Sequence, residues 1–166
     1  MNNLAKKIES FSSNTLWTTV FLFLFTIFIF NIKFRYLPSG DTYPNELLPI
    51  TIINEGNLDF NEFVENSDKL PYYFRKVNNK VISSYPVVPG ILNTPVYFVA
   101  NLAGVDMEEN KFLLSMLTSS LLASLSVVFM YFCLLIISNK KTTAFYFALI
   151  YAFGTSVLSI ASRGIW

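Results

Sequence analysis

The residues best suited to chemistry in this chain follow an uncharged, phenylalanine-rich run that ends at Ile32. They form the segment Ser39-Gly40-Asp41-Thr42-Tyr43-Pro44, and Asp41 is the first acidic residue after that run. A carboxylate is costly to place where a membrane helix meets water, so its presence raises the question of a chemical role. The alternative is that Asp41 caps a helix, a position that aspartate often fills. The two roles are compatible.

The chain contains no histidine and a single cysteine, Cys133. The absence of histidine excludes the usual base at neutral pH, a serine–histidine dyad and a histidine-rich zinc site. A lone cysteine inside an apolar run allows no internal disulfide and says little about redox compartment. If the protein transfers protons near pH 7, a carboxylate such as Asp41 is the natural candidate.

Three uncharged runs dominate the chain, Ser10 to Ile32, Phe112 to Asn139 and Thr142 to Ser162, and they count 23, 28 and 21 residues. About 20 apolar residues suffice for a helix to cross a bilayer core of ~30 Å. Hydrophobic residues make up 53% of the chain, and the mean hydropathy is +0.47. The sequence therefore predicts an all-α polytopic membrane protein with transmembrane helices over 10–32, 112–138 and 143–162, and it excludes a soluble enzyme.

Lysines flank the runs on one predicted side of the membrane: Lys6 and Lys7 before the first, and Lys140 and Lys141 between the second and third. The positive-inside rule places both pairs in the cytoplasm. Residues 1–9 are then a cytoplasmic N-terminus, 139–142 a cytoplasmic turn, 33–111 a large external loop and 163–166 an external end. We expect a multi-pass integral membrane protein with a cytoplasmic N-terminus. The chain has no basic stripe, so nucleic acid is not an expected partner.

The external loop has its own predicted organisation. A helix capped by Thr42 or Asp41, with Pro44 and Glu46 in its first turn, is expected to run to Ile53. Pro49 should kink or divide it. The acidic stretch 57–63 is expected to be a solvated loop. Two strands of a hairpin are expected within 72–85 around Asn78-Asn79, since asparagine tolerates the positive φ of a tight turn.

A second apolar helix is predicted over Ile91–Ala103. At 13 residues it is too short to span, so we expect it to lie in the membrane interface or on the membrane domain. Asp106 and Glu109 then resemble a capping box for the next membrane helix.

The order of these features resembles a known group. An anchor helix is followed by S-G-D-T, an apolar helix ending N-E-G-N-L-D, a Y-F-R-K-V-x-N-K-V hairpin, S-Y-P-x-x-P-G with an apolar helix, and A-x-x-Y-A-F-G-T-S-x-x-S-I-A-S-R-G-I-W. This is similar to the N-terminal part of the polytopic GT-C glycosyltransferases. That superfamily includes the protein mannosyltransferases and the lipid A aminoarabinose transferases, and the likeness is greatest to their less-studied bacterial relatives. It covers roughly Asn31 to Trp166.

The resemblance implies a function and a catalytic residue. Such enzymes move a sugar from a polyprenyl-phosphate carrier to an acceptor glycan, lipid or protein on the non-cytoplasmic face. An essential acid near the end of the first membrane helix corresponds here to Asp41. Many members have a second acid next to it, whereas this chain has Thr42, and its nearest acid is Glu46. This difference leaves open a second carboxylate and a divalent metal; no metal ligand is assigned, and no cofactor is certain.

Four further residues are candidates for substrate binding. Arg163 corresponds to an S-R-x-x-W pattern near the family's active site, where a guanidinium can hold phosphate; its alternative role is an interfacial anchor together with Trp166. Arg35 is expected to anchor the first helix, and from beside Asp41 it can attract an anionic carrier headgroup. Tyr43 and Glu46 are expected to border the acceptor.

Superfamily members commonly have eight or more membrane helices, so we expect this chain to be the N-terminal portion of a longer enzyme and to be inactive alone. The main alternative is a non-catalytic three-span protein or partner subunit whose external loop binds another protein. A piece of a transporter is a weaker alternative, since the three runs carry no charge.

Overall fold

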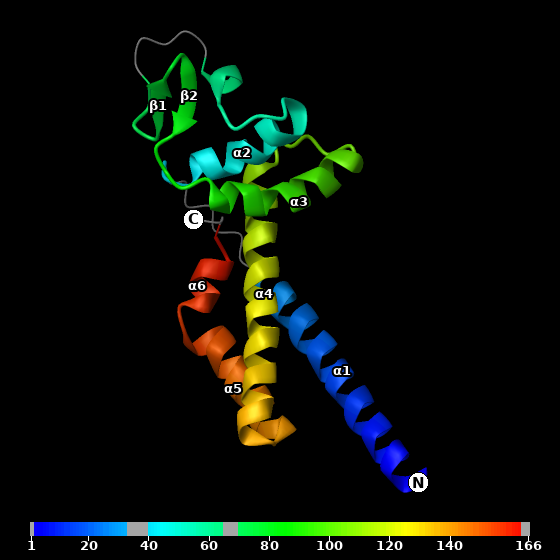
Figure 1. Ribbon diagram of the computed structural model, residues 1–166. Helices are drawn as coiled ribbons and strands as arrows, with labels where there is room; N and C mark the ends of the chain where they lie inside the picture. Colours follow the sequence, from blue (N-terminus) through cyan, green and yellow to red (C-terminus); the bar gives the residue numbers. More distant parts are fainter. Residues whose placement is uncertain (1, 33–39, 65–69, 164–166) are drawn as a thin grey trace. The chain divides into compact units, whose positions relative to one another are not determined.

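The computed structural model (Figure 1) describes residues 2–32, 40–64 and 70–163, with side chains from Asn14 onward. The chain divides into two compact units, each treated separately below. The helical unit comprises Met1–Phe34 and Ser120–Ser162. The loop unit comprises Arg35–Ser119 and Arg163–Trp166.

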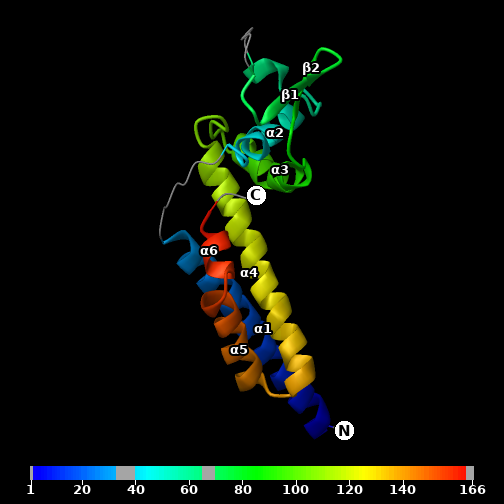
Figure 2. The same cartoon turned by 90° about the vertical axis from the view of Figure 1, so that its left-hand side faces the viewer.

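The helical unit contains α1 (Asn2–Asn31), the part of α4 (Lys111–Ser138) from Ser120 on, α5 (Lys141–Gly154) and α6 (Val157–Ala161). α1 contacts α5, and buried side chains from α1, α4, α5 and α6 form one cluster. Figure 2 shows the backbone of these helices. On α5 the buried side chains are alanines four residues apart, a spacing that puts small groups on one helix face: Ala144, Ala148 and Ala152. Aromatic rings join α1 to α5, with Phe25 and Phe153 at 5.9 Å between centroids.

Two helices among the described residues are long and apolar enough to cross a membrane, by length and composition: Asn14–Asn31 within α1, and all of α4. This confirms the predicted length of the first two runs. The prediction of one continuous helix over 143–162 is wrong. Thr155 adopts an extended conformation, with φ −123° and ψ −177°, and separates α5 from α6. With a rise of 1.5 Å per residue, the 14 residues of α5 extend only about 21 Å.

The loop unit is built around two helices, α2 (Tyr43–Asn54) and α3 (Val88–Leu102). Every residue from Pro44 to Thr51 is buried, so α2 lies inside this core, and the helix is not divided at Pro49. On α3 the buried residues recur every three or four positions: Gly90, Asn93, Tyr97 and Ala100. A Cβ at Gly90 would lie 2.7 Å from the Leu48 side chain. The glycine therefore allows the two helices to pack closely.

The opposite side of α3 is apolar and exposed. Phe98, Val99 and Leu102 are 51%, 65% and 72% exposed, and Val88, Ile91 and Leu92 add to the same surface. α3 begins three residues before the predicted start at Ile91, with Pro89 in its first turn. Gly104, at φ +75°, follows its end. The helix thus has one face in the core of the loop unit and another that is apolar and uncovered within it.

The predicted hairpin is confirmed. β1 (Phe74–Val77) and β2 (Lys80–Ser83) pair antiparallel, with Phe74 opposite Ser83 and Val77 opposite Lys80. Asn78 and Asn79 form the two-residue connection at φ 48° and 62°. Two successive positive φ angles are typical of the type I′ turn, whose twist matches that of the strands.

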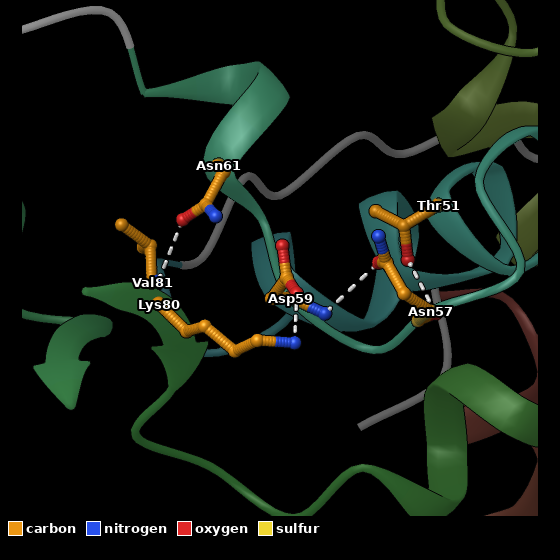
Figure 3. A network of polar contacts seen from close by, with 6 residues as sticks. All are labelled: Thr51, Asn57, Asp59, Asn61, Lys80 and Val81. Atoms are coloured by element: carbon orange, nitrogen blue, oxygen red, sulfur yellow. Dashed lines mark hydrogen bonds and ion pairs between the residues drawn. The ribbon is translucent and has the colours of Figure 1, made fainter. Parts of the chain in front are cut away.

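The acidic stretch 57–63 is not the solvated loop that the sequence predicts, because it packs along β2 (Figure 3). The Phe60 N–H donates to the Val81 carbonyl at 2.8 Å, and the Val81 N–H donates to Asn61 Oδ1 at 2.9 Å. Asp59, only 7% exposed, forms an ion pair of 3.0 Å with Lys80, and Phe60 is fully buried. The stretch ends in a 3-10 turn, η1 (Asn61–Phe63).

The chain enters α4 through a capped turn. Asp106 Oδ1 accepts from the backbone N–H groups of Glu108 and Glu109, both at 2.9 Å. This is the Asp106 half of the predicted capping box, and it satisfies two N–H groups just before Lys111. Met107 and Leu114, on either side of that point, are buried in the core of the loop unit.

Candidate functional site

Asp41 lies in the turn that precedes α2 and is partly buried. The N-cap position belongs to the next residue, Thr42, whose side chain makes no capping hydrogen bond. The early turns of α2 are closed instead by backbone groups: the N–H groups of Asn45 and Glu46 donate to the Thr42 carbonyl, at 2.9 and 3.1 Å. The N-cap of the helix is therefore one residue after Asp41, and the helix itself begins at Tyr43.

The Asp41 carboxylate contacts two tyrosines. The Tyr72 hydroxyl donates to Asp41 Oδ1 at 3.3 Å, and Tyr85 also donates a hydrogen bond to this carboxylate. That hydrogen bond, followed by partial burial and the negative charge of Asp41, raises the pKa of Tyr85 to about 12. Tyr72 is 67% exposed, and its pKa is also raised, by partial desolvation and by the charge of Asp41. Both phenols therefore stay protonated at neutral pH and act as hydrogen-bond donors to Asp41.

The hairpin explains why these tyrosines meet. Opposite residues of the two strands are equally far from the Asn78-Asn79 turn. The pairing continues outward from the strands, with the Ser84 N–H donating to the Tyr73 carbonyl at 2.9 Å. Tyr72 and Tyr85 are equidistant from that turn, so they come next in the same register. This symmetry is visible in the sequence and could have identified the two tyrosines as neighbours of each other. Nothing in the sequence shows that they also meet Asp41.

Gly40 makes room for this arrangement. A Cβ built at Gly40 would lie 2.0 Å from the Tyr72 hydroxyl and 2.6 Å from the ring carbon that carries it. Any side chain at position 40 would therefore displace the Tyr72 ring. We call the group of Gly40, Asp41, Tyr72 and Tyr85 the aspartate–tyrosine cluster.

A second carboxylate, Glu46, lies in the core of the same unit and is only 2% exposed. Burial raises the pKa of this group, while a hydrogen bond of 3.2 Å from the Thr42 hydroxyl and the charge of Lys111 act in the opposite direction. Glu46 also contributes to a raised pKa of Tyr97, after the larger effect of burial on that phenol. The Tyr97 hydroxyl donates to the Lys111 carbonyl.

Other buried polar groups surround the start of α2. Asn93, fully buried on α3, donates through Nδ2 to the Asn45 carbonyl at 2.9 Å, while its Oδ1 has no hydrogen-bond partner among the described residues. The Lys111 ammonium lies 5.8 Å from the centre of the Tyr43 ring, a distance typical of a cation–π contact. These interactions fix α2 against α3 and the first turn of α4.

Three of the predicted site residues thus lie close together in sequence at the start of α2: Asp41, Tyr43 and Glu46. Asp41 is accessible, Tyr43 is half-buried and Glu46 is enclosed. Arg163 is exposed in the bend after α6, and Arg35 lies outside the described residues. Sequence reasoning missed the two tyrosines, Asn93 and Lys111, because their contacts with the start of α2 depend on how distant segments pack.

Within the described parts of the chain, no group of three or more His, Cys, Asp or Glu side chains could hold a metal ion. The chain matches no protein-family model, and neither the curated proteins nor the solved structures give a significant match. The functional argument therefore rests on the residues themselves.

Proposed function

We propose that this chain is the N-terminal portion of an integral membrane glycosyltransferase of the GT-C type. It would move a sugar from a polyprenyl-phosphate carrier to an acceptor hydroxyl on the non-cytoplasmic face. The observation that carries the proposal is the aspartate–tyrosine cluster. In it Asp41 is partly exposed, precedes the helix that it could have capped, and is bonded to side chains from a distant hairpin.

The membrane arrangement is part of this proposal. α1 and α4 would each cross the bilayer, and α5 with α6 would make the third crossing as a broken helix. The apolar face of α3 would lie in the outer interface, where Phe98, Val99 and Leu102 could bury their exposed surface. Asp41 would then stand near the membrane surface, where the headgroup of a lipid-linked donor is found.

Asp41 would act as the base. The acceptor hydroxyl oxygen bonds to the anomeric carbon, the bond from that carbon to the phosphate breaks, and Asp41 takes the hydroxyl proton. The carrier phosphate is its own leaving group, so the protein must supply the base and groups that hold the phosphate. The hydrogen bonds from Tyr72 and Tyr85 would orient the carboxylate. Arg163 and Arg35 are the proposed phosphate-binding cations.

The decisive variant is Asp41→Asn in the full-length gene product. The amide oxygen of asparagine still accepts a hydrogen bond from a tyrosine, but the side chain no longer takes up a proton at neutral pH. We expect transfer of a labelled sugar from a polyprenyl-phosphate donor to fall by ~10²–10⁴-fold. Activity is normalised to folded protein recovered in detergent.

Asp106→Asn is the matched control, because it makes the same change at another carboxylate of the loop unit, one that caps a turn. This variant should keep wild-type transfer. Wild-type turnover in Asp41→Asn would remove the residue-level support for catalysis. It would favour the alternative of a non-catalytic partner subunit whose loop unit binds another protein.

A further inference from the structure

The helical unit contains a second site candidate, far in sequence from Asp41. It is a groove of about 460 Å³ between α1 and α5, within the range of small-molecule sites. Six of its lining residues carry the argument below: Trp17, Thr18, Phe21, Lys141, Phe145 and Tyr146.

The groove has an apolar body. Phe21 and Phe145 both line it and contact each other, with 6.3 Å between ring centroids. Trp17 and Tyr146, at 70% and 60% exposed, leave wide aromatic surfaces uncovered in the helical unit. Trp and Tyr with one apolar and one polar end are the residues enriched where a bilayer meets water.

One end of the groove is cationic. Lys141 is the first residue of α5, and the exposed Lys140 stands at its N-cap position, where the side chain makes no capping hydrogen bond. The first N–H groups of a helix have no partner within it and attract an anion, and the lysine charge acts in the same direction. The groove therefore combines an apolar body with an end complementary to a phosphate group.

We propose that this groove binds one anionic phospholipid of the cytoplasmic leaflet, with its phosphate at Lys141 and part of an acyl chain along Phe21 and Phe145. The inference rests on the proposed membrane arrangement, which puts the α4–α5 link on the cytoplasmic side. The proposed sugar donor is used on the opposite face. A diacyl phospholipid is therefore the occupant argued for here, and a polyprenyl phosphate is the competitor to test.

The groove contains its own reporter. The sequence has two tryptophans, so in a Trp166→Phe background the fluorescence comes from Trp17 alone. The full chain is reconstituted in bilayers that contain, at equal mole fraction, phosphatidylglycerol or phosphatidylcholine brominated near the headgroup end of the acyl chains. Bromine quenches tryptophan on contact, so the two quenching curves give the relative affinity of the site for the two lipids.

One lysine near an anionic surface contributes about five-fold in affinity. We therefore expect phosphatidylglycerol to be preferred about five-fold in the parent chain. Lys141→Gln should abolish most of that preference. Lys140→Gln is the matched control, because it removes the same charge from the neighbouring residue, whose side chain does not line the groove. This variant should keep most of the preference.

Four other outcomes would each overturn the proposal. Equal quenching by both lipids would mean that the chain enters the bilayer as proposed but has no anionic site. Equal losses in the two lysine variants would mean general attraction to the membrane surface. If unbrominated polyprenyl phosphate relieved quenching more strongly than unbrominated phosphatidylglycerol, the occupant would be a different lipid. Quenching by neither lipid would overturn the membrane arrangement as well.

Discussion

Asp41 and Glu46 carry the same functional group five residues apart, yet their surroundings give them different properties. Asp41 is partly exposed and bonded to two phenols. Glu46 is enclosed beside Thr42 and Lys111, and burial raises its pKa. The sequence could identify both as acids that follow a predicted membrane helix. It could not separate an accessible carboxylate from an enclosed one, because that difference depends on contacts with residues 72, 85 and 111.

The coupling between Asp41 and Tyr85 predicts a titration. The pKa of Tyr85 is raised to about 12, first by its hydrogen bond to Asp41. In Asp41→Asn the negative charge is absent, so this pKa should fall toward the ordinary tyrosine value of about 10. The measurement is the phenolate absorbance difference between each protein and its Tyr85→Phe counterpart. At a pH midway between these two values, the phenol should be mostly protonated in the parent protein and mostly ionised in the Asp41→Asn variant. An unchanged titration would show that Asp41 does not bond to Tyr85.

Glu46 predicts a dependence of stability on pH. Its raised pKa means that folding favours the protonated acid. The stability that this preference contributes is fully present below the unfolded pKa of about 4.5 and is lost as pH rises through the higher folded value. Glu46→Gln cannot titrate and keeps a similar shape. We therefore expect the Tm of the variant, relative to the parent, to rise as the pH increases above that unfolded value.

The charge of Lys111 opposes that trend, because it lowers the pKa of Glu46. In Lys111→Gln, the loss of Tm with rising pH should therefore be larger than in the parent protein. Thermal melts of the three proteins in detergent, followed by circular dichroism, provide the test. A Glu46→Gln variant less stable than the parent at neutral pH would mean that attraction to Lys111 outweighs the cost of burying the charge.

At the scale of elements, the sequence predicted structure that depends on local signals, but it did not predict contacts between distant segments. The hairpin followed from Asn78-Asn79, because two residues that tolerate positive φ are enough to define a tight turn. The acidic stretch looked solvated because its partner, the outer edge of β2, is distant in the sequence. The acidic charge of the stretch does not predict its contacts. It is held by a hydrogen bond with the Val81 backbone, an ion pair with Lys80 and the burial of Phe60 in the core.

The helix predicted over 143–162 failed for another reason. The prediction used length and apolar composition, which cannot detect a single residue in extended conformation. Thr155, immediately after Gly154, is such a residue. The Thr155 hydroxyl donates back to the Tyr151 carbonyl at 2.7 Å and so satisfies an acceptor at the end of α5. Gly-Thr-Ser at 154–156 was a visible signal for a helix end, since glycine weakens a helix and small hydroxyl residues bond to the nearby backbone.

At the scale of the whole molecule, the two units differ in what they leave uncovered. The loop unit has its own core, so it does not depend on a membrane for all of its apolar burial; the core includes Leu47, Leu48, Phe60, Phe74 and Tyr97. The helical unit leaves large side chains such as Trp17, Phe28 and Ile137 exposed. A bilayer is the environment in which such a surface is stable, and the proposed arrangement supplies it.

That arrangement predicts which sites a membrane-impermeant thiol reagent reaches in intact cells. Single cysteines are placed at Ser84, exposed after β2, and at Asn139, exposed in the α4–α5 link, in a chain with Cys133→Ala. In the proposed arrangement, which follows the lysines at 6, 7, 140 and 141, the link lies in the cytoplasm and the hairpin outside. Position 84 should therefore react in intact cells, and position 139 only after the cells are opened. Both should react fully in detergent, which controls for burial and for the positive φ of Asn139. Reaction at 139 but not at 84 would reverse the orientation, move Asp41 to the cytoplasmic side and remove the proposed enzyme from the face on which its acceptor lies.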